Sequence, residues 1–230
     1  MLPNQVFGKL ELNSVRYSEY DVYEKDGAEW IAPSPTAEVL VNNQLEKPER
    51  LLLDALNTGR VLYMSEYADD FKREILLSFI RCYGLLTKDN AERLEWIKDL
   101  LAEIFTHFVG CKAPEKTDDP SIREHYAKLV SRYQLRDLAI GLEMPSTPNE
   151  DGFCNPVMVW YFNSLRQAIE TIYIIALTSH DINLRMCKHC GAAFIADHGR
   201  SVFCSDRCRN QFNVYKHRAN KKDEKYNLER

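Results

Sequence analysis

The chain has 230 residues, of which 45% are hydrophobic and 28% charged, and its formal net charge at pH 7 is −4. This length suits one medium domain plus a small one, and the apolar fraction excludes a predominantly disordered chain. Residues 185–230 carry eleven Lys/Arg against five Asp/Glu, a net charge of +6, so the first 184 residues carry −10. This asymmetry excludes a general affinity of the whole molecule for polyanions and favours a local basic site near the C-terminus.

Nothing in the sequence has the pattern of a secretory signal or of a membrane span. The first residues, MLPNQVFGKLELN, lack a basic segment followed by an apolar run, and the longest apolar segment, 156–177, carries polar residues across its middle. Cys82, Cys111 and Cys154 are isolated, which is typical of buried thiols in a reducing compartment. We therefore expect a cytoplasmic protein without a membrane partner.

In chain order, the first predicted elements are short strands, followed by helices. Residues 5–33 alternate polar and apolar side chains around a turn at 25–27, which predicts a β-hairpin or meander. Apolar periodicity then predicts helices over about 36–57 (broken before Pro48 and closing at Gly59), 65–86, 90–109, 120–134 and 156–178. The stretch 135–155 contains two glycines and two prolines and is predicted to be a loop.

The predicted fold is therefore mainly α. We expect an N-terminal β-hairpin or meander and a helical domain over residues 1–180, with a separate zinc finger over 181–230. The helical domain is a candidate for regulation or for forming a homodimer. It gives no sign of catalysis, because its histidines are not paired with a nucleophile and it has no phosphate-binding glycine loop or hydrolase motif. We predict no catalytic residues and no enzyme activity.

Four cysteines near the C-terminus are the most informative feature of the sequence. Cys187 and Cys190 are separated by two residues, and Cys204 and Cys208 by three, with thirteen residues between the pairs. Two close pairs with this spacing let four thiolates converge on one structural Zn²⁺ per chain. Residues 192–196 and 201–203 are predicted as two strands joined by a turn at 197–200. A helix capped by Ser205 follows to about residue 220, which completes a treble-clef-like finger.

The helix after the second cysteine pair is predicted to bind nucleic acid. Its outer face combines amides, which suit an adenine edge, with cations, which suit guanine or phosphate, and a helix fits the DNA major groove. Cations at the predicted hairpin tip and beyond the helix would contact backbone phosphates. The predicted nucleic-acid contacts are Arg200, Arg207, Arg209, Asn210, Asn213, Lys216, His217, Arg218, Lys221 and Lys222.

A resemblance to a known family rests on these same residues. The segment RMCKHCGAAFI beginning at Arg185, FCSDRCRNQ beginning at Phe203, and YKHR beginning at Tyr215 resemble the CGNR-type zinc finger of bacterial proteins. The stretch LDALNT at 53–58 is similar to a segment of that family's N-terminal domain. The resemblance implies an α-rich domain joined to a C-terminal finger in a DNA-binding transcription regulator. Two departures are the tetrad CRNQ at 208–211 and the tighter spacing of the ligand pairs.

Three other interpretations stay open. Small zinc modules also bind proteins, which would make the chain an interaction adaptor whose helical domain binds a protein or a small effector, and others only hold a chain together. Asp197 and His198 precede an Asn and a His in a zinc-bearing unit, as in HNH-type nucleases, although the five residues between His198 and Cys204 leave little room for the loop that such enzymes need.

Overall fold

The computed structural model describes residues 9–41, 45, 47–112, 119–131, 137–144 and 155–228, without the side chains of residues 126, 129–131 and 220–228. It divides into two compact units, Met1–Asp181 and Ile182–Arg230. Secondary structure amounts to 48% helix and 22% strand. The expectation of a mainly α protein is therefore wrong, and the fold is mixed α/β. Most of the unexpected strands lie in the first unit, where they pair across long stretches of sequence.

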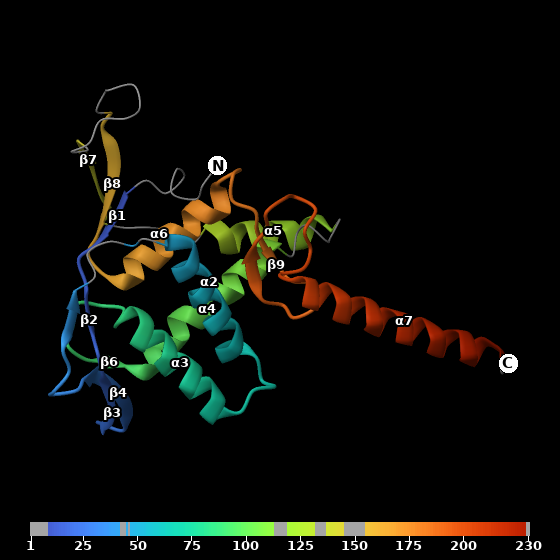
Figure 1. Cartoon of the computed structure of the whole chain (residues 1–230), viewed down its shortest axis with the longest axis horizontal. Helices are drawn as coiled ribbons and strands as arrows, with labels where there is room; N and C mark the ends of the chain where they lie inside the picture. Colours follow the sequence, from blue (N-terminus) through green and yellow to red (C-terminus); the bar gives the residue numbers. More distant parts are fainter. Residues whose placement is uncertain are drawn as a thin grey trace. The chain divides into compact units, whose positions relative to one another are not determined.

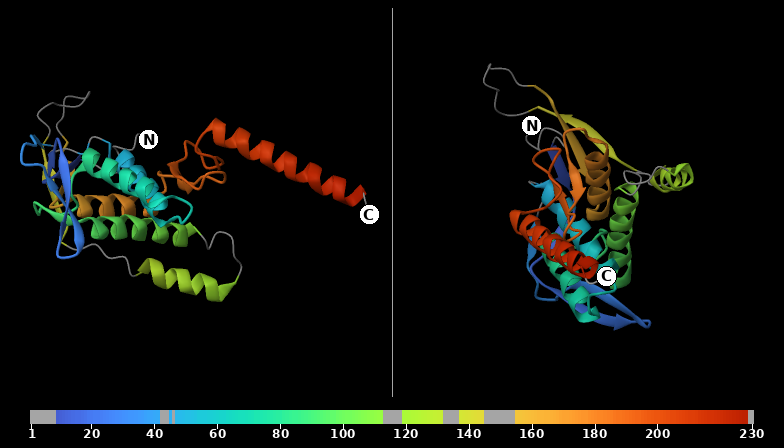
Figure 2. Two further views of the ribbon diagram at one scale, coloured as in Figure 1. Left: turned by 90° about the horizontal axis from the view of Figure 1, so that it is seen from below. Right: turned by 90° about the vertical axis from the view of Figure 1, so that its right-hand side faces the viewer.

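The helices of the first unit are α2 (Pro48–Tyr63), α3 (Asp69–Tyr83), α4 (Leu94–Lys112), α5 (Pro120–Ser131) and α6 (Leu165–Thr178). Of these, α3, α4 and α6 pack around α2, and the strands gather at one end of the helices (Figures 1 and 2). The helical periodicity reflects buried faces, because Leu52, Leu101, Ile104 and Ile172 have no exposed surface. The predicted helices at 65–86, 90–109 and 120–134 correspond to α3, α4 and α5 with shifted ends; residues 132–134 lie outside the described part.

The helix predicted over 36–57 differs most from the structure at its two ends. Residues 39–41 are extended, which differs from the prediction, whereas α2 begins at the predicted break, with Pro48 in its first turn, where the missing N–H costs no hydrogen bond. Gly59 does not end the helix but lies inside it against α4. A Cβ at Gly59 would lie 2.0 Å from the Leu101 carbonyl oxygen. This glycine is thus required for close packing of two helices.

Three small sheets accompany the helices of the first unit. One has the order β1 (Lys9–Leu12), β8 (Val157–Phe162), β7 (Ala139–Glu143), the second β3 (Tyr20–Lys25), β4 (Ala28–Pro33), β6 (Glu92–Arg93), and the third pairs β2 (Val15–Tyr17) with β5 (Val39–Val41). In the first sheet β1 runs parallel to β8, and β7 runs antiparallel to it. The N-terminal strands are therefore distributed over all three sheets.

The predicted hairpin near the N-terminus is confirmed for β3 and β4. These strands pair antiparallel from Tyr20–Pro33 to Lys25–Ala28. Asp26 and Gly27 both have positive φ, 53° and 69°, as a two-residue hairpin turn of the type favoured by Asp-Gly requires.

Residues 135–178 were predicted as a loop followed by one helix, and the structure confirms the helix over 165–178 but places strands in the predicted loop and at the predicted helix start. Residues 139–143 form β7, and the segment 156–178 contains β8 followed by α6. Residues 135–136 and 145–154 of the predicted loop lie outside the described part. Ser164 separates strand from helix, because its hydroxyl accepts a hydrogen bond from the Gln167 amide at 3.2 Å as an N-cap.

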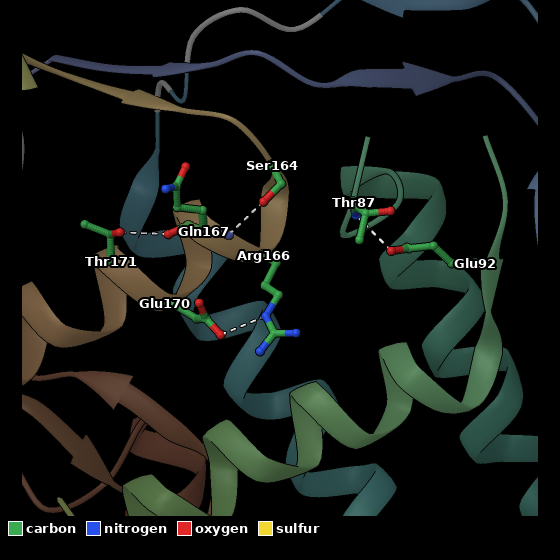
Figure 3. A network of polar contacts seen from close by, with 7 residues as sticks. All are labelled: Thr87, Glu92, Ser164, Arg166, Gln167, Glu170 and Thr171. Carbon is green, nitrogen blue, oxygen red and sulfur yellow. Dashed lines mark hydrogen bonds and ion pairs between the residues drawn. The ribbon is translucent and has the colours of Figure 1, made fainter. Parts of the chain in front are cut away.

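A polar network fixes the start of α6 beside the connection between α3 and α4 (Figure 3). The buried Glu92 carboxylate accepts hydrogen bonds from the backbone amides of Leu86 and Thr87, at 2.7 and 2.9 Å. The Arg166 amide donates to the Leu86 carbonyl at 3.0 Å. The Arg166 side chain then forms an ion pair with Glu170 at 3.0 Å. Because Glu92 uses both oxygens on backbone amides, its role here is structural.

The second unit contains β9 (Leu184–Met186), β10 (Ala193–Ile195) and α7 (Asp206–Leu228). β10 pairs antiparallel with β9 rather than with residues 201–203, which are not a strand. The predicted hairpin of the finger is therefore displaced toward the N-terminus, and the first cysteine pair lies at its connection. The helix begins one residue after Ser205, near the predicted start, but continues to Leu228 instead of ending at 220.

Candidate metal centre

The first cysteine pair lies in the tight connection between β9 and β10. The Cys187 amide donates to the Ala192 carbonyl at 2.8 Å, which continues the strand pairing beyond β9. The Gly191 amide donates to the Cys187 carbonyl at 2.9 Å, and Gly191 has a φ of 71°, which favours glycine. The connection therefore folds back on itself and brings Cys187 and Cys190 to the same side.

The second pair is positioned by the start of α7. The Ser205 hydroxyl accepts a hydrogen bond from the Cys208 amide at 3.2 Å, so the predicted N-cap is confirmed. Cys204 thus immediately precedes the cap and Cys208 lies in the first turn. The Lys188 amide donates to the Val202 carbonyl at 2.9 Å, which ties the segment before the helix to the first cysteine pair.

The four sulfur atoms converge. The Cys190 and Cys204 sulfurs are 3.7 Å apart, those of Cys204 and Cys208 are 3.5 Å apart, and all four lie within 4.8 Å of one another. A tetrahedral ion with metal–sulfur bonds of about 2.3 Å places its sulfurs about 3.8 Å apart. A disulfide would need about 2.05 Å, and the cysteines are free thiols. The four cysteines can therefore hold a metal ion.

The electrostatics of the cluster explain why a cation fits it. Burial raises the pKa of the Cys187 thiol, but backbone amides of Cys190, Cys204 and His189 lower it more, to about 6. Burial and the neighbouring cysteines raise the pKa of Cys204. One thiolate is thus stabilised by the backbone, whereas further thiolates in the same space repel it. A bound cation removes that repulsion.

A small apolar core surrounds the sulfurs. Cys187, Phe194 and Ala196 are buried, and Phe203 packs against them together with Cys190 and Cys208. Phe212 of α7 continues this core, with its ring centroid 5.3 Å from that of Phe203. Only the first turns of α7 take part, because all residues from 213 to 219 are exposed.

Sequence reasoning missed the contacts made by the two residues between the first cysteines. His189 Nε2 lies 3.1 Å from Gln211 Oε1, and its ring stacks near Tyr215 at 5.7 Å. The Lys188 ammonium lies 5.2 Å from the Phe212 ring centroid. Both residues connect the first cysteine pair to α7. The sequence offered one signal for these contacts. Lys188 and His189 lie between two cysteines of the cluster, and α7 carries a third, Cys208, so the two residues are brought close to α7.

The predicted nucleic-acid contacts are exposed wherever their side chains are described. Arg209 forms an exposed ion pair with Asp206 at 3.0 Å. Arg200 belongs to a turn closed by the Ser201 amide and the His198 carbonyl at 3.1 Å, and not to the tip of a hairpin as predicted. The exposed residues are Arg200, Arg207, Arg209, Asn210, Asn213, Lys216, His217 and Arg218; the side chains of Lys221 and Lys222 lie outside the described part.

The first unit has a hollow of about 430 Å³ between the β3–β4 hairpin, α3 and α4. Both acidic and basic side chains line it, including the ion pair between Glu29 and Arg73.

Within the described residues, the four cysteines of the second unit form the single cluster of three or more His, Cys, Asp or Glu side chains close enough to share a metal. The candidate site is therefore the cysteine cluster with α7.

Comparisons with known proteins give no relative: no family model, curated protein or solved structure matches the chain. Among the described residues, no helix combines the length and apolar character needed to cross a membrane.

Proposed function

We propose that this chain is a nucleic-acid-binding protein, with DNA as the first choice, in which one Zn²⁺ holds a small finger that presents α7. The observation that carries the proposal is the exposed, cation-rich surface of α7, anchored at its start by the four-cysteine cluster. As in the CGNR-type family that the sequence resembles, the role would be transcription regulation. The acidic first unit would then regulate or dimerise the finger.

Zinc is the metal that the donor set favours. Four cysteine sulfurs in a tetrahedral arrangement suit Zn²⁺ or an iron site, and Zn²⁺ needs no redox function. The site would be closed, because four protein ligands leave no position for a catalytic water. Its role would be structural. Elemental analysis of natively purified protein should find one zinc per chain; iron, or no metal, would contradict this assignment.

The surface of α7 suits a nucleic acid for two reasons. Between residues 206 and 218 it carries four Arg or Lys against a single acid, and that acid, Asp206, is already paired with Arg209. The amides of Asn210 and Asn213 lie among these cations, and both are exposed. Amides and cations on one exposed helix can contact base edges and phosphates together.

A protein-binding adaptor is the second candidate, and one observation favours it. Val214 and Tyr215 on the same helix are 47% and 57% exposed. Exposed tyrosine beside cations is also common at the centre of protein interfaces. The two candidate functions differ in how the binding affinity depends on salt, because contacts with phosphates weaken as the salt concentration rises.

The test is a fluorescence anisotropy titration of the zinc-loaded full chain with duplex DNA, single-stranded DNA and RNA, starting at about 50 mM salt. Affinity should fall with salt, by roughly 0.9 log units per log unit of salt for each phosphate neutralised. Replacing Lys216 and Arg218 by Gln should weaken binding to all sequences alike and reduce that slope by roughly 1.8. The matched control replaces Lys98 and Arg81, which are exposed cations of the first unit, by Gln. It should change neither the affinity nor its dependence on salt.

Two further variants test whether an asparagine of α7 contacts a base edge. Asn210→Ala or Asn213→Ala should relax sequence preference by about 1–3 kcal/mol if the amide contacts a base edge. Failure of every nucleic acid to bind would contradict the proposal and favour the adaptor. Metal-dependent cleavage of the probe would instead identify a nuclease.

A further inference from the structure

The β3–β4–β6 sheet has one buried face and one face that carries aromatic and basic side chains. Ile31 of β4 pairs with Glu92 of β6, and both side chains are buried. Because side chains alternate between the two faces of a sheet, the neighbouring pair, Trp30 and Arg93, lies on the opposite face. Tyr23 of β3 pairs with Trp30 and therefore lies on that face too. One row across the three strands thus contains Tyr23, Trp30 and Arg93.

The start of α4 and the end of β3 extend this row. The ring centroids of Trp30 and Trp96 are 6.2 Å apart. The Arg93 guanidinium lies 5.5 Å from the Trp30 ring centroid and 5.2 Å from that of Trp96. The Lys25 ammonium lies 5.5 Å from the Trp30 ring centroid. At these distances the indole rings attract both cations. We call these five residues, with Tyr23, the aromatic face.

Two properties of the aromatic face indicate a ligand in addition to a structural role. Trp96 and Tyr23 are 57% and 39% exposed, so a large part of each side chain stays in contact with solvent. Acids outnumber bases in the first unit, yet neither Lys25 nor Arg93 forms an ion pair with a carboxylate among the described residues. Exposed tryptophan, tyrosine and arginine in one group are typical of binding surfaces.

This combination of side chains suits a nucleotide. Proteins bind single strands by stacking the bases on aromatic rings and by placing cations beside the phosphates. A carboxylate would use the cations but not the rings, and a neutral aromatic compound would use the rings but not the cations. The first 184 residues carry −10, which opposes a long polyanion and favours a contact with one or a few nucleotides.

We infer that the aromatic face is a binding site for an unpaired nucleotide, whose base stacks on Trp96 and whose phosphate contacts Arg93 and Lys25. The source of this nucleotide is either a free mononucleotide or an unpaired position of a nucleic acid strand. A duplex does not fit, because its bases are stacked on one another. The site belongs to the first unit, and the inference does not rest on the proposed binding of nucleic acid by α7.

Isothermal titration calorimetry of the zinc-loaded full chain with adenosine monophosphate and with single-stranded tetradeoxyadenylate tests the stacking. Trp96→Ala should raise the dissociation constant by roughly five- to 150-fold, the range that corresponds to stacking of one base. Trp96→Phe keeps a ring and should restore most of the affinity. The matched control is Tyr63→Ala, because Tyr63 is 61% exposed and its ring centroid also lies 6.2 Å from another ring, that of Phe105. Circular dichroism verifies the fold of each variant.

The phosphate contact has a variant of its own. Lys25→Gln should weaken binding of tetradeoxyadenylate and reduce the slope of log affinity against log salt by roughly 0.7, the value for one phosphate of a single strand. Lys98→Gln, at another exposed lysine of the first unit, should change neither the affinity nor the slope.

The two ligands identify the source of the nucleotide. Equal affinities point to a free mononucleotide, whereas tetradeoxyadenylate that binds at least about tenfold more tightly points to a single strand. Binding should persist in a chain with Lys216→Gln and Arg218→Gln; loss of all binding there would assign it to α7 and overturn the inference. It would also be overturned if neither ligand binds, if Trp96→Ala has no effect, or if inorganic phosphate or tetraglutamate binds as tightly as adenosine monophosphate.

Discussion

The Tyr83 hydroxyl donates a hydrogen bond of 2.6 Å to the Asp54 carboxylate and thereby joins α3 to α2. Asp54 also lies 3.7 Å from the Arg50 guanidinium, one turn earlier in α2. Burial, together with the hydrogen bond to Asp54, raises the pKa of Tyr83 above its usual range. The visible role of Asp54 is to hold two helices together.

We expect this hydrogen bond to make stability depend on pH at the alkaline end. Below about pH 9 the phenol is protonated in both the folded and the unfolded chain, so its contribution is complete. As the pH rises through about 10, the unfolded chain ionises first, and the free energy of unfolding falls because the folded state holds its proton longer. Tyr83→Phe should lower that free energy by about 0.5–1 kcal/mol at neutral pH and flatten the alkaline decline.

Urea denaturation of the wild type and the variant between pH 7 and 11 measures this difference. Tyr23→Phe serves as the control, because Tyr23 is 39% exposed on β3. The same alkaline decline in the Tyr83→Phe chain would show that other groups cause it.

At the scale of the element, the cysteine spacing and Ser205 were sufficient to predict how α7 starts, because a cap and a ligand pair act within a few residues. The run VMVWYF at 157–162 is predicted as the start of a helix but forms β8, since a short continuous apolar run has no period that distinguishes a helix from a strand. Its β-branched and aromatic residues favour the strand that forms. Gly59 is predicted to end a helix. In the structure it allows α2 to pack closely against Leu101 of α4, and the local sequence does not show which residue of another helix will lie beside it.

The cap of α7 links helix formation to metal binding. Ser205→Ala removes the acceptor for the Cys208 amide, which costs about 1 kcal/mol of helix stability. Since Cys204 and Cys208 flank this cap, we expect the affinity for the metal to fall by roughly tenfold or less. Competition with a chromophoric chelator measures the affinity. Ser205→Thr keeps a hydroxyl acceptor and should restore most of it; equal loss in both variants would exclude the cap as the cause.

At the scale of the whole molecule, the two units have separate cores. The first is built from the faces of α2, α4 and α6, and the second from a few residues around the sulfurs. So small a core needs an additional stabilising element, which a metal ion held by the four cysteines would supply. The sequence showed the basic tail and the cysteine cluster, which are local features. The long-range pairing that makes the first unit mixed α/β was not visible in any local pattern.

Removing the metal should therefore unfold one unit and spare the other. Chelation should increase amide hydrogen exchange across residues 182–219, while exchange in α2 and α4 stays slow. Cys204→Ala should produce the same pattern without a chelator. Cys82→Ala, at an exposed thiol of the first unit, should leave the pattern unchanged. Protection that persists across 182–219 after complete metal removal would mean that the apolar contacts alone hold the finger.

The parallel pairing of β1 with β8 also affects how the chain is made. Lys9 pairs with Val159, 150 positions later, so β1 leaves the ribosome long before its partner strand exists. At translation rates of about 5–20 residues per second, the delay is roughly 8–30 s. Leu10 and Leu12, which are buried in the finished sheet, lack that partner throughout this interval. β1 of the nascent chain is therefore open to aggregation during this interval, and slower translation prolongs the exposure.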